Sequence, residues 1–229
     1  MSLGFGKRWL FSPLAMLIVA AFISSCGGGS GDDPAIDGDG GGGGGGDVQS
    51  ITGESGNKVA LTGTWIKECD PDLQDGESES SDLTFSGSTF TLETDYWYDS
   101  TTCFGTPDLT LKVSGSFVLE NELIVPMQNV NVTATGIDIL INTSVGTIYN
   151  PDVVSEFNAN HECGYNDWEI DISKPLLDTG CGPDSNFKDL LYVDDTVDPD
   201  VLYSGDDEGP LDPDGYPTHI DSDTAQERL

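Results

Sequence analysis

Positive charge is scarce in this chain. Its 229 residues include eight lysines and arginines against 41 aspartates and glutamates, which gives a formal net charge of −33 at pH 7. A surface this acidic repels phosphate backbones and anionic lipid headgroups, so we exclude nucleic acid as a partner. The same charge destabilises a compact fold by self-repulsion unless salt or divalent cations screen it.

The motifs of common catalytic sites are also missing. The sequence has two histidines, His161 and His219, and contains no Gly-x-Ser-x-Gly, His-Glu-x-x-His or phosphate-binding glycine motif. His161, Glu162 and Cys163 are consecutive, and consecutive residues on an extended chain point to opposite faces, which disfavours a metal site there. We therefore predict a protein without enzymatic activity and without a cofactor.

No apolar run is long enough to cross a membrane as a helix. The longest, Leu14–Ile23, has ten residues, whereas a spanning helix needs about 20. Because Lys7 and Arg8 precede it, this region has the pattern of a secretory signal peptide. Residues 23–26 (ISSC) resemble the lipobox of bacterial lipoproteins. That resemblance implies cleavage before Cys26, lipid on its thiol and a membrane anchor outside the cytoplasm.

The segment after Cys26 has the composition of a flexible tether. Gly27–Asp47 is rich in glycine and aspartate, with glycine at every position from 40 to 46. As a random coil it would hold a domain about 25 Å from the membrane. Gly27 directly after the cysteine implies the outer membrane under the sorting rule of enteric bacteria. We predict a signal peptide over 1–25, a lipidated cysteine and tether over 26–48, and one domain over 49–229.

Four cysteines remain once Cys26 is assigned to lipid. An even number in an exported chain indicates two disulfides, and four cysteines allow three pairings. We favour the local pairing, Cys69 with Cys103 and Cys163 with Cys181. Each bridge is expected to stabilise the fold by about 3 kcal/mol, mainly by restricting the unfolded chain.

The domain has the periodicity of β-strands, with apolar and polar residues alternating over 90–96 and 109–114. Turn-forming residues at 86–88, 105–108, 120–121 and 135–136 separate such runs. Strands are predicted over 61–67, 83–85, 90–96, 109–114, 122–127, 137–141, 168–172, 187–193, 201–203 and 217–220.

One helix is predicted, over 151–160, where Pro151 stands at the first position and Asn150 precedes it as a cap. About eight to ten short antiparallel strands with little helix indicate an all-β fold, either an up-and-down barrel or a sandwich.

Gly63-Thr64-Trp65 on the first strand resembles the Gly-x-Trp signature of lipocalins, in which the tryptophan closes one end of the barrel. In lipocalins an arginine near the end of the last strand packs over that tryptophan, and Arg228 is the matching candidate here. Residues 96–115, 163–168 and 202–206 also resemble lipocalin-like domains of exported bacterial proteins. The resemblance implies an antiparallel up-and-down lipocalin-like β-barrel.

Two functions fit such a barrel. An eight-stranded barrel has room for about one small ligand, so the domain is expected to bind or carry a small hydrophobic molecule. Alternatively, side chains fill the barrel and its loops contact another protein of the cell envelope, in a structural or interaction role. Aromatic residues that would line or fill the interior are Phe85, Phe90, Trp97, Phe117 and Trp168.

A third hypothesis, calcium binding, comes from the acidic C-terminal third. Aligning Gly215 with the glycine of an EF-hand loop puts Asp212 and Asp214 at ligand positions and Asp221 at the twelfth position. The ligand set is incomplete, because a proline falls at the first position and aspartate replaces the bidentate glutamate. The alternative is a solvated loop between two barrel strands.

Overall fold

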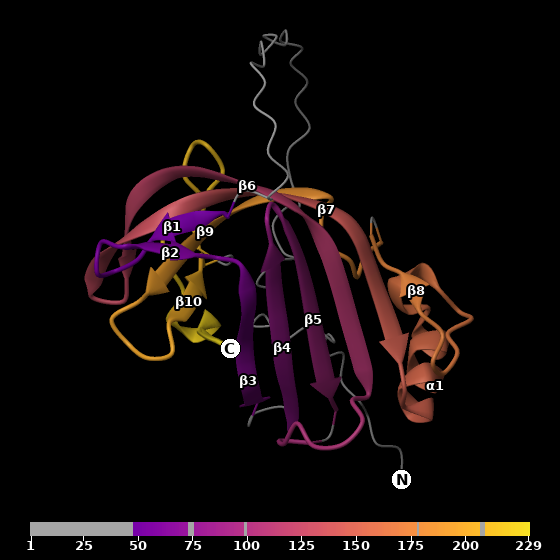
Figure 1. Ribbon diagram of the computed structural model, residues 1–229. Helices are drawn as coiled ribbons and strands as arrows, with labels where there is room; N and C mark the ends of the chain where they lie inside the picture. Colours follow the sequence, from indigo (N-terminus) through magenta and orange to yellow (C-terminus); the bar gives the residue numbers. More distant parts are fainter. Residues whose placement is uncertain (1–47, 73–75, 99, 178, 207–208) are drawn as a thin grey trace, which may run out of the picture.

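The computed structural model describes residues 48–72, 76–98, 100–177, 179–206 and 209–229. Figure 1 shows a β-rich molecule with a short helical region at one side. Its elements are β1 (Ser50–Thr52), β2 (Lys58–Ala60), β3 (Gly63–Asp72), β4 (Glu77–Ser86), β5 (Thr89–Trp97), β6 (Leu109–Met127), β7 (Val130–Ile148), α1 (Pro151–Asn160), η1 (Glu162–Gly164), β8 (Lys174–Pro175), β9 (Asn186–Asp194), β10 (Val201–Ser204), η2 (Ser222–Thr224) and β11 (Gln226–Arg228).

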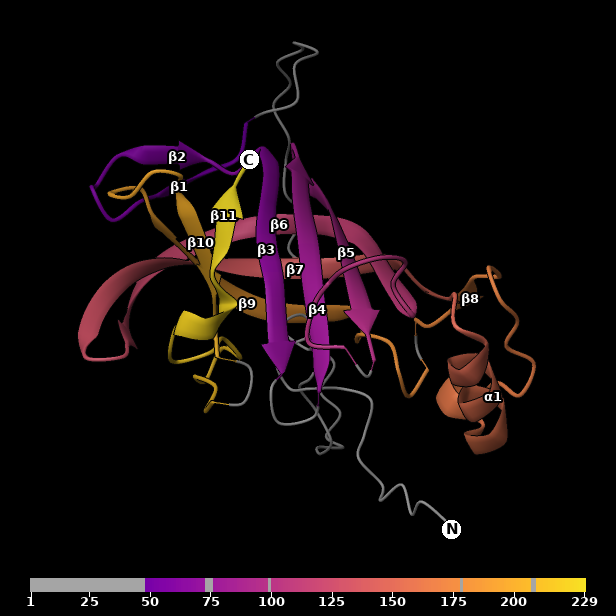
Figure 2. The ribbon, with the colours of Figure 1, turned by 90° about the horizontal axis from the view of Figure 1, so that it is seen from below.

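The strands form a closed antiparallel barrel. Going round the ring, the order is β3, β4, β5, β6, β7, β9, β10 and β11, and β11 pairs with β3 to complete it. Figure 2 shows β11 between β3 and β10. The predicted all-β up-and-down barrel with little helix is confirmed. Every strand of the ring lies between Gly63 and Arg228, so its closure uses no residue before Val48.

The central strands are longer than the sequence pattern predicted. Runs 109–114 and 122–127 belong to one strand, β6, which pairs with β7 along most of its length. The turns predicted at 120–121 and 135–136 are wrong. The first is a register shift between Leu119 and Glu122, and the second lies inside β7. Gly136 serves packing instead, because a Cβ there would lie 3.1 Å from the Tyr216 ring.

Two predicted strands do not form. Residues 168–172 follow α1 in a loop, where Asn158 Oδ1 accepts a hydrogen bond from Trp168 N at 2.6 Å. Residues 217–220 make only isolated bridges, Ile220 with Gly205 and Pro217 with Leu211. The helix was predicted correctly, and Asn150 Oδ1 caps it by accepting from Asp152 N at 2.9 Å.

One end of the barrel is closed around Trp65. Its ring is fully buried, and its Nε1 donates to Leu61 O at 3.0 Å. The guanidinium carbon of Arg228 lies 5.2 Å from the centre of the Trp65 ring, as the lipocalin resemblance implied. Arg228 also donates to Thr62 O at 3.0 Å and pairs with Asp200 Oδ2 at 3.3 Å. Cation–π packing and hydrogen bonds thus join the first and last barrel strands.

Among the described residues, three apolar clusters make up the core. The largest fills the barrel and includes Trp65 and the β1–β2 hairpin. A second surrounds Trp168 and Phe157 in the segment between β7 and β9. The third joins the β6–β7 hairpin to Tyr216 and Ile220, over the outward side of β9. The loops therefore have small cores of their own.

Gly115 provides a test of the barrel packing. A Cβ at this position would lie 2.2 Å from Leu140 O and 2.8 Å from the Phe90 ring. Because the backbone oxygen of the paired strand cannot easily move, Gly115→Ala is expected to lower the free energy of unfolding by about 3 kcal/mol. Gly180→Ala is the control, since no described residue lies within 4 Å of its Cβ position. Equal urea midpoints for the two variants would contradict this packing.

Candidate functional site

The barrel contains a cavity of about 60 Å³. At roughly 10–15 Å³ for each water-sized group, it has room for about five such groups. One part of its wall is apolar, formed by Leu83, Phe85, Phe90, Leu92, Ile137, Ile139, Leu191 and Leu202.

The apolar wall follows from strand alternation. Leu83 and Phe85 on β4 are register partners of Leu92 and Phe90 on β5. Since side chains two residues apart share a face, both pairs point inward and their polar neighbours point outward. The sequence therefore determines this wall through its period of two.

Two of the five aromatic residues predicted at the interior line the cavity, namely Phe85 and Phe90. Phe117 is buried in the barrel core, with its ring centroid 5.2 Å from that of Phe85, but it does not line the space. Trp97 is also buried without lining it.

For Trp168 the prediction is wrong. Its ring centroid lies 5.5 Å from that of Phe157, in the cluster that belongs to the α1 region. The cause is the missing strand over 168–172, because this residue lies in a loop with its own apolar core instead of on the barrel wall.

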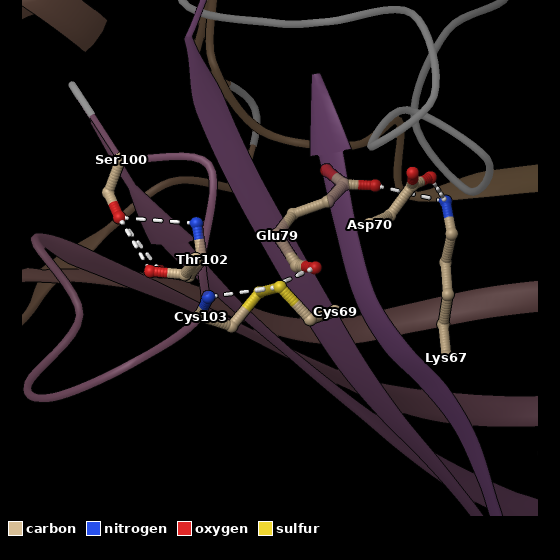
Figure 3. Close-up of a disulfide and its surroundings, with 7 residues drawn as sticks. All are labelled: Lys67, Cys69, Asp70, Glu79, Ser100, Thr102 and Cys103. Atoms are coloured by element: carbon tan, nitrogen blue, oxygen red, sulfur yellow. Dashed lines mark hydrogen bonds and ion pairs between the residues drawn. A yellow bond between two sulfur atoms is a disulfide. The ribbon is translucent and has the colours of Figure 1, made fainter. Parts of the chain in front are cut away.

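The cavity is also lined by polar and charged side chains, here called the polar wall, which the sequence analysis did not predict. Lys67 Nζ lies 3.2 Å from Glu79 Oε1 and 2.8 Å from Asp70 Oδ2, as Figure 3 shows. Lys67 and Glu79 are both buried and both line the cavity. The place of Lys67 on the strand could have predicted this, since it is two residues after Trp65 and its side chain therefore points to the same inward face.

Asp189 on β9 is a second buried carboxylate of this wall. Its Oδ1 accepts from Leu190 N at 2.7 Å and from Gly205 N at 3.0 Å. A Cβ on Gly205 would lie 2.7 Å from the same oxygen. Glycine at 205 thus lets the backbone approach the carboxylate closely.

The other polar residues that line the cavity are Gln226, Tyr203, Ser81, Thr94, Ser204 and Thr224. Gln226 Oε1 is buried and has no hydrogen-bond partner in the part of the chain that the structure describes. Burial and the nearby Asp194 carboxylate raise the pKa of the Tyr203 phenol above its usual value. The phenol is therefore uncharged at neutral pH.

The disulfides pair as predicted, Cys69 with Cys103 and Cys163 with Cys181. Cys103 N donates to Cys69 Sγ at 2.9 Å, and Cys103 Sγ lies 3.2 Å from Glu79 O. In Figure 3 this bridge is adjacent to the Lys67 ion pairs. It ties the loop between β5 and β6 to the strands that carry the polar wall.

The aspartates of the calcium hypothesis cap turns. Asp212 Oδ1 accepts from Asp214 N and from Tyr216 N, each at 2.9 Å. Asp221 Oδ1 accepts from Asp223 N at 2.9 Å. Across the described ranges, no three His, Cys, Asp or Glu side chains are grouped so as to hold a metal ion.

The predicted signal peptide, Cys26 and the tether up to residue 47 lie outside the described residues. None of the helices in the described part of the chain is long and apolar enough to span a membrane. No protein-family model matches the sequence, and no curated protein matches it significantly. Fold and site together define a lipocalin-like barrel with a small internal cavity lined by both apolar and polar side chains.

Proposed function

We propose that this protein is a membrane-tethered lipoprotein that binds a small, mainly apolar molecule inside its barrel. The main support for the proposal is the cavity inside the barrel with its apolar wall. Space lined by aliphatic and aromatic side chains favours an apolar ligand, because such surface gains about 25 cal/mol per Å² when removed from water.

Cavity size limits the ligand. Pockets for drug-sized molecules measure about 300–1,000 Å³, whereas this one measures about 60 Å³. A ligand of about five non-hydrogen atoms matches the available space. Burying four methylene-sized groups contributes about 3 kcal/mol, so we expect dissociation constants in the millimolar range for simple compounds.

A structural or interaction role in the cell envelope is the second candidate. It is favoured by the β6–β7 hairpin, where Val118, Ile124 and Val130 are large exposed apolar side chains. Apolar surface of this kind is typical of protein contacts when it is contiguous. Ligand binding remains the main proposal because it accounts for the cavity.

The proposed location is the outer membrane, facing an extracytoplasmic compartment. It is supported by the lipobox at 23–26, the residue Gly27 and the glycine-rich tether. Two disulfides agree with an oxidising compartment. Each buried acyl CH₂ contributes about 0.8 kcal/mol, so a cysteine with several acyl chains would be held at the membrane almost permanently.

Cys26→Ser tests the anchor. The variant lacks the thiol that accepts lipid, so it is expected to incorporate no radiolabelled palmitate when expressed in a bacterium that processes lipoproteins. Ser25→Ala is the matched control, since a small residue remains before the cysteine, and it is expected to be labelled like the wild type. Labelled Cys26→Ser protein would refute lipidation at this position.

Leu191→Trp tests binding in the cavity. A larger side chain on this wall would occupy the ligand space, and butan-1-ol affinity is expected to fall by about tenfold or more. Leu140→Trp adds the same bulk on the outside of β7, where Leu140 is exposed, and should leave affinity unchanged. Amide chemical-shift titration measures affinity and shows that each variant is folded. Equal affinity in both variants would place the alcohol elsewhere.

A further inference from the structure

We propose that the cavity prefers ligands whose polar end is a positively charged hydrogen-bond donor, so that small alkylamines bind better than alkyl carboxylates of the same length. This inference rests on the proposed ligand-binding function and adds the chemical class of the ligand. Its basis is the polar wall formed by Lys67, Glu79, Asp189 and Gln226.

The formal charges of the residues that line the cavity sum to a negative value. Glu79 and Asp189 supply two carboxylates and Lys67 supplies one ammonium group. That ammonium group already contacts two carboxylates, Glu79 at 3.2 Å and Asp70 at 2.8 Å. A ligand carboxylate that approached Lys67 would therefore also approach Glu79 and Asp70, and like charges at short range in a buried site repel strongly.

Hydrogen bonding favours the same class of ligand. Gln226 Oε1 is a buried acceptor without a partner in the described residues. A buried acceptor gains from a ligand that donates a hydrogen bond, since leaving it unsatisfied costs free energy. An ammonium group has three donors, a hydroxyl has one and a carboxylate has none, so the three head groups are ranked in that order.

The rest of the molecule adds to this preference. The whole chain carries a formal charge of −33, and such a field attracts cations and repels anions before they reach the cavity. The apolar wall, with Phe85 and Phe90, accepts a short alkyl chain while the head group faces the polar wall. An alkylamine therefore matches both sides of the space.

Butylamine, butan-1-ol and butanoate are matched probes, because each has four carbons in an unbranched chain and they differ in the polar end. Titrated at pH 7 into the chain from residue 27 onward, with its disulfides formed, butylamine is expected to bind about tenfold more tightly than butanoate, with butan-1-ol between them. The readout is the amide shifts of residues 189 and 226. Competition between butan-1-ol and butylamine, followed through the same shifts, distinguishes binding in the cavity from binding to the acidic surface.

Asp189→Asn tests whether the negative charge of Asp189 is responsible for the preference for amines. The amide oxygen still accepts the backbone hydrogen bonds of Leu190 and Gly205, while the negative charge is lost. Butylamine affinity is expected to fall by about fivefold or more, and butan-1-ol affinity to change less than about twofold. The matched control is Asp82→Asn, which removes an equal charge from an exposed position on β4 and should affect neither ligand.

Each result has a distinct meaning. If butanoate binds as tightly as butylamine, or Asp82→Asn and Asp189→Asn have equal effects, the proposed selectivity is wrong while ligand binding stands. If none of the three compounds shifts residues 189 and 226, ligand binding in the barrel is itself refuted. The wild-type comparison needs no variant, so a folding defect in Asp189→Asn would leave the test decisive.

Discussion

Closure of the barrel depends on the contact between its last and first strands. β11 has only three residues, and it pairs with β3 on one side and β10 on the other. Packing of Arg228 over Trp65, with its bonds to Thr62 and Asp200, supports that short strand at the closed end. Without β11 the sheet would have two open edges, and the internal cavity would lose one wall.

A closed ring also explains how a highly acidic chain forms a defined interior. Strand alternation directs carboxylates outward at most positions, where water and salt screen them. Glu79 and Asp189 are exceptions, since both are buried in the cavity wall. Lys67 faces Glu79, and backbone N–H groups hydrogen-bond to Asp189. Polar and charged side chains are therefore part of the barrel interior, which distinguishes this cavity from a purely apolar one.

Local signals in the sequence predicted much of the fold. Alternation located Phe85 and Phe90 on the inner wall, and the Pro151 signature located the helix. Long-range effects were not predicted, because they depend on partners distant in sequence. Because β6 pairs with β7 on both sides of residues 120–121, the strand continues past the predicted turn. Trp168 lies outside the barrel because it packs in the separate apolar cluster of the α1 region. The ion pair between Lys67 and Glu79 was not predicted because it depends on the register between β3 and β4, which the pattern of each strand alone does not determine.

Ligand binding requires that the barrel contain space for a small apolar group. Crystals of the domain held under xenon pressure test it most directly, because xenon enters apolar cavities without needing a particular polar partner. We expect a xenon atom inside the barrel, in contact with Phe85, Phe90 and Leu191. A barrel without xenon, or xenon bound only beside Trp168 in the α1 region, would contradict it.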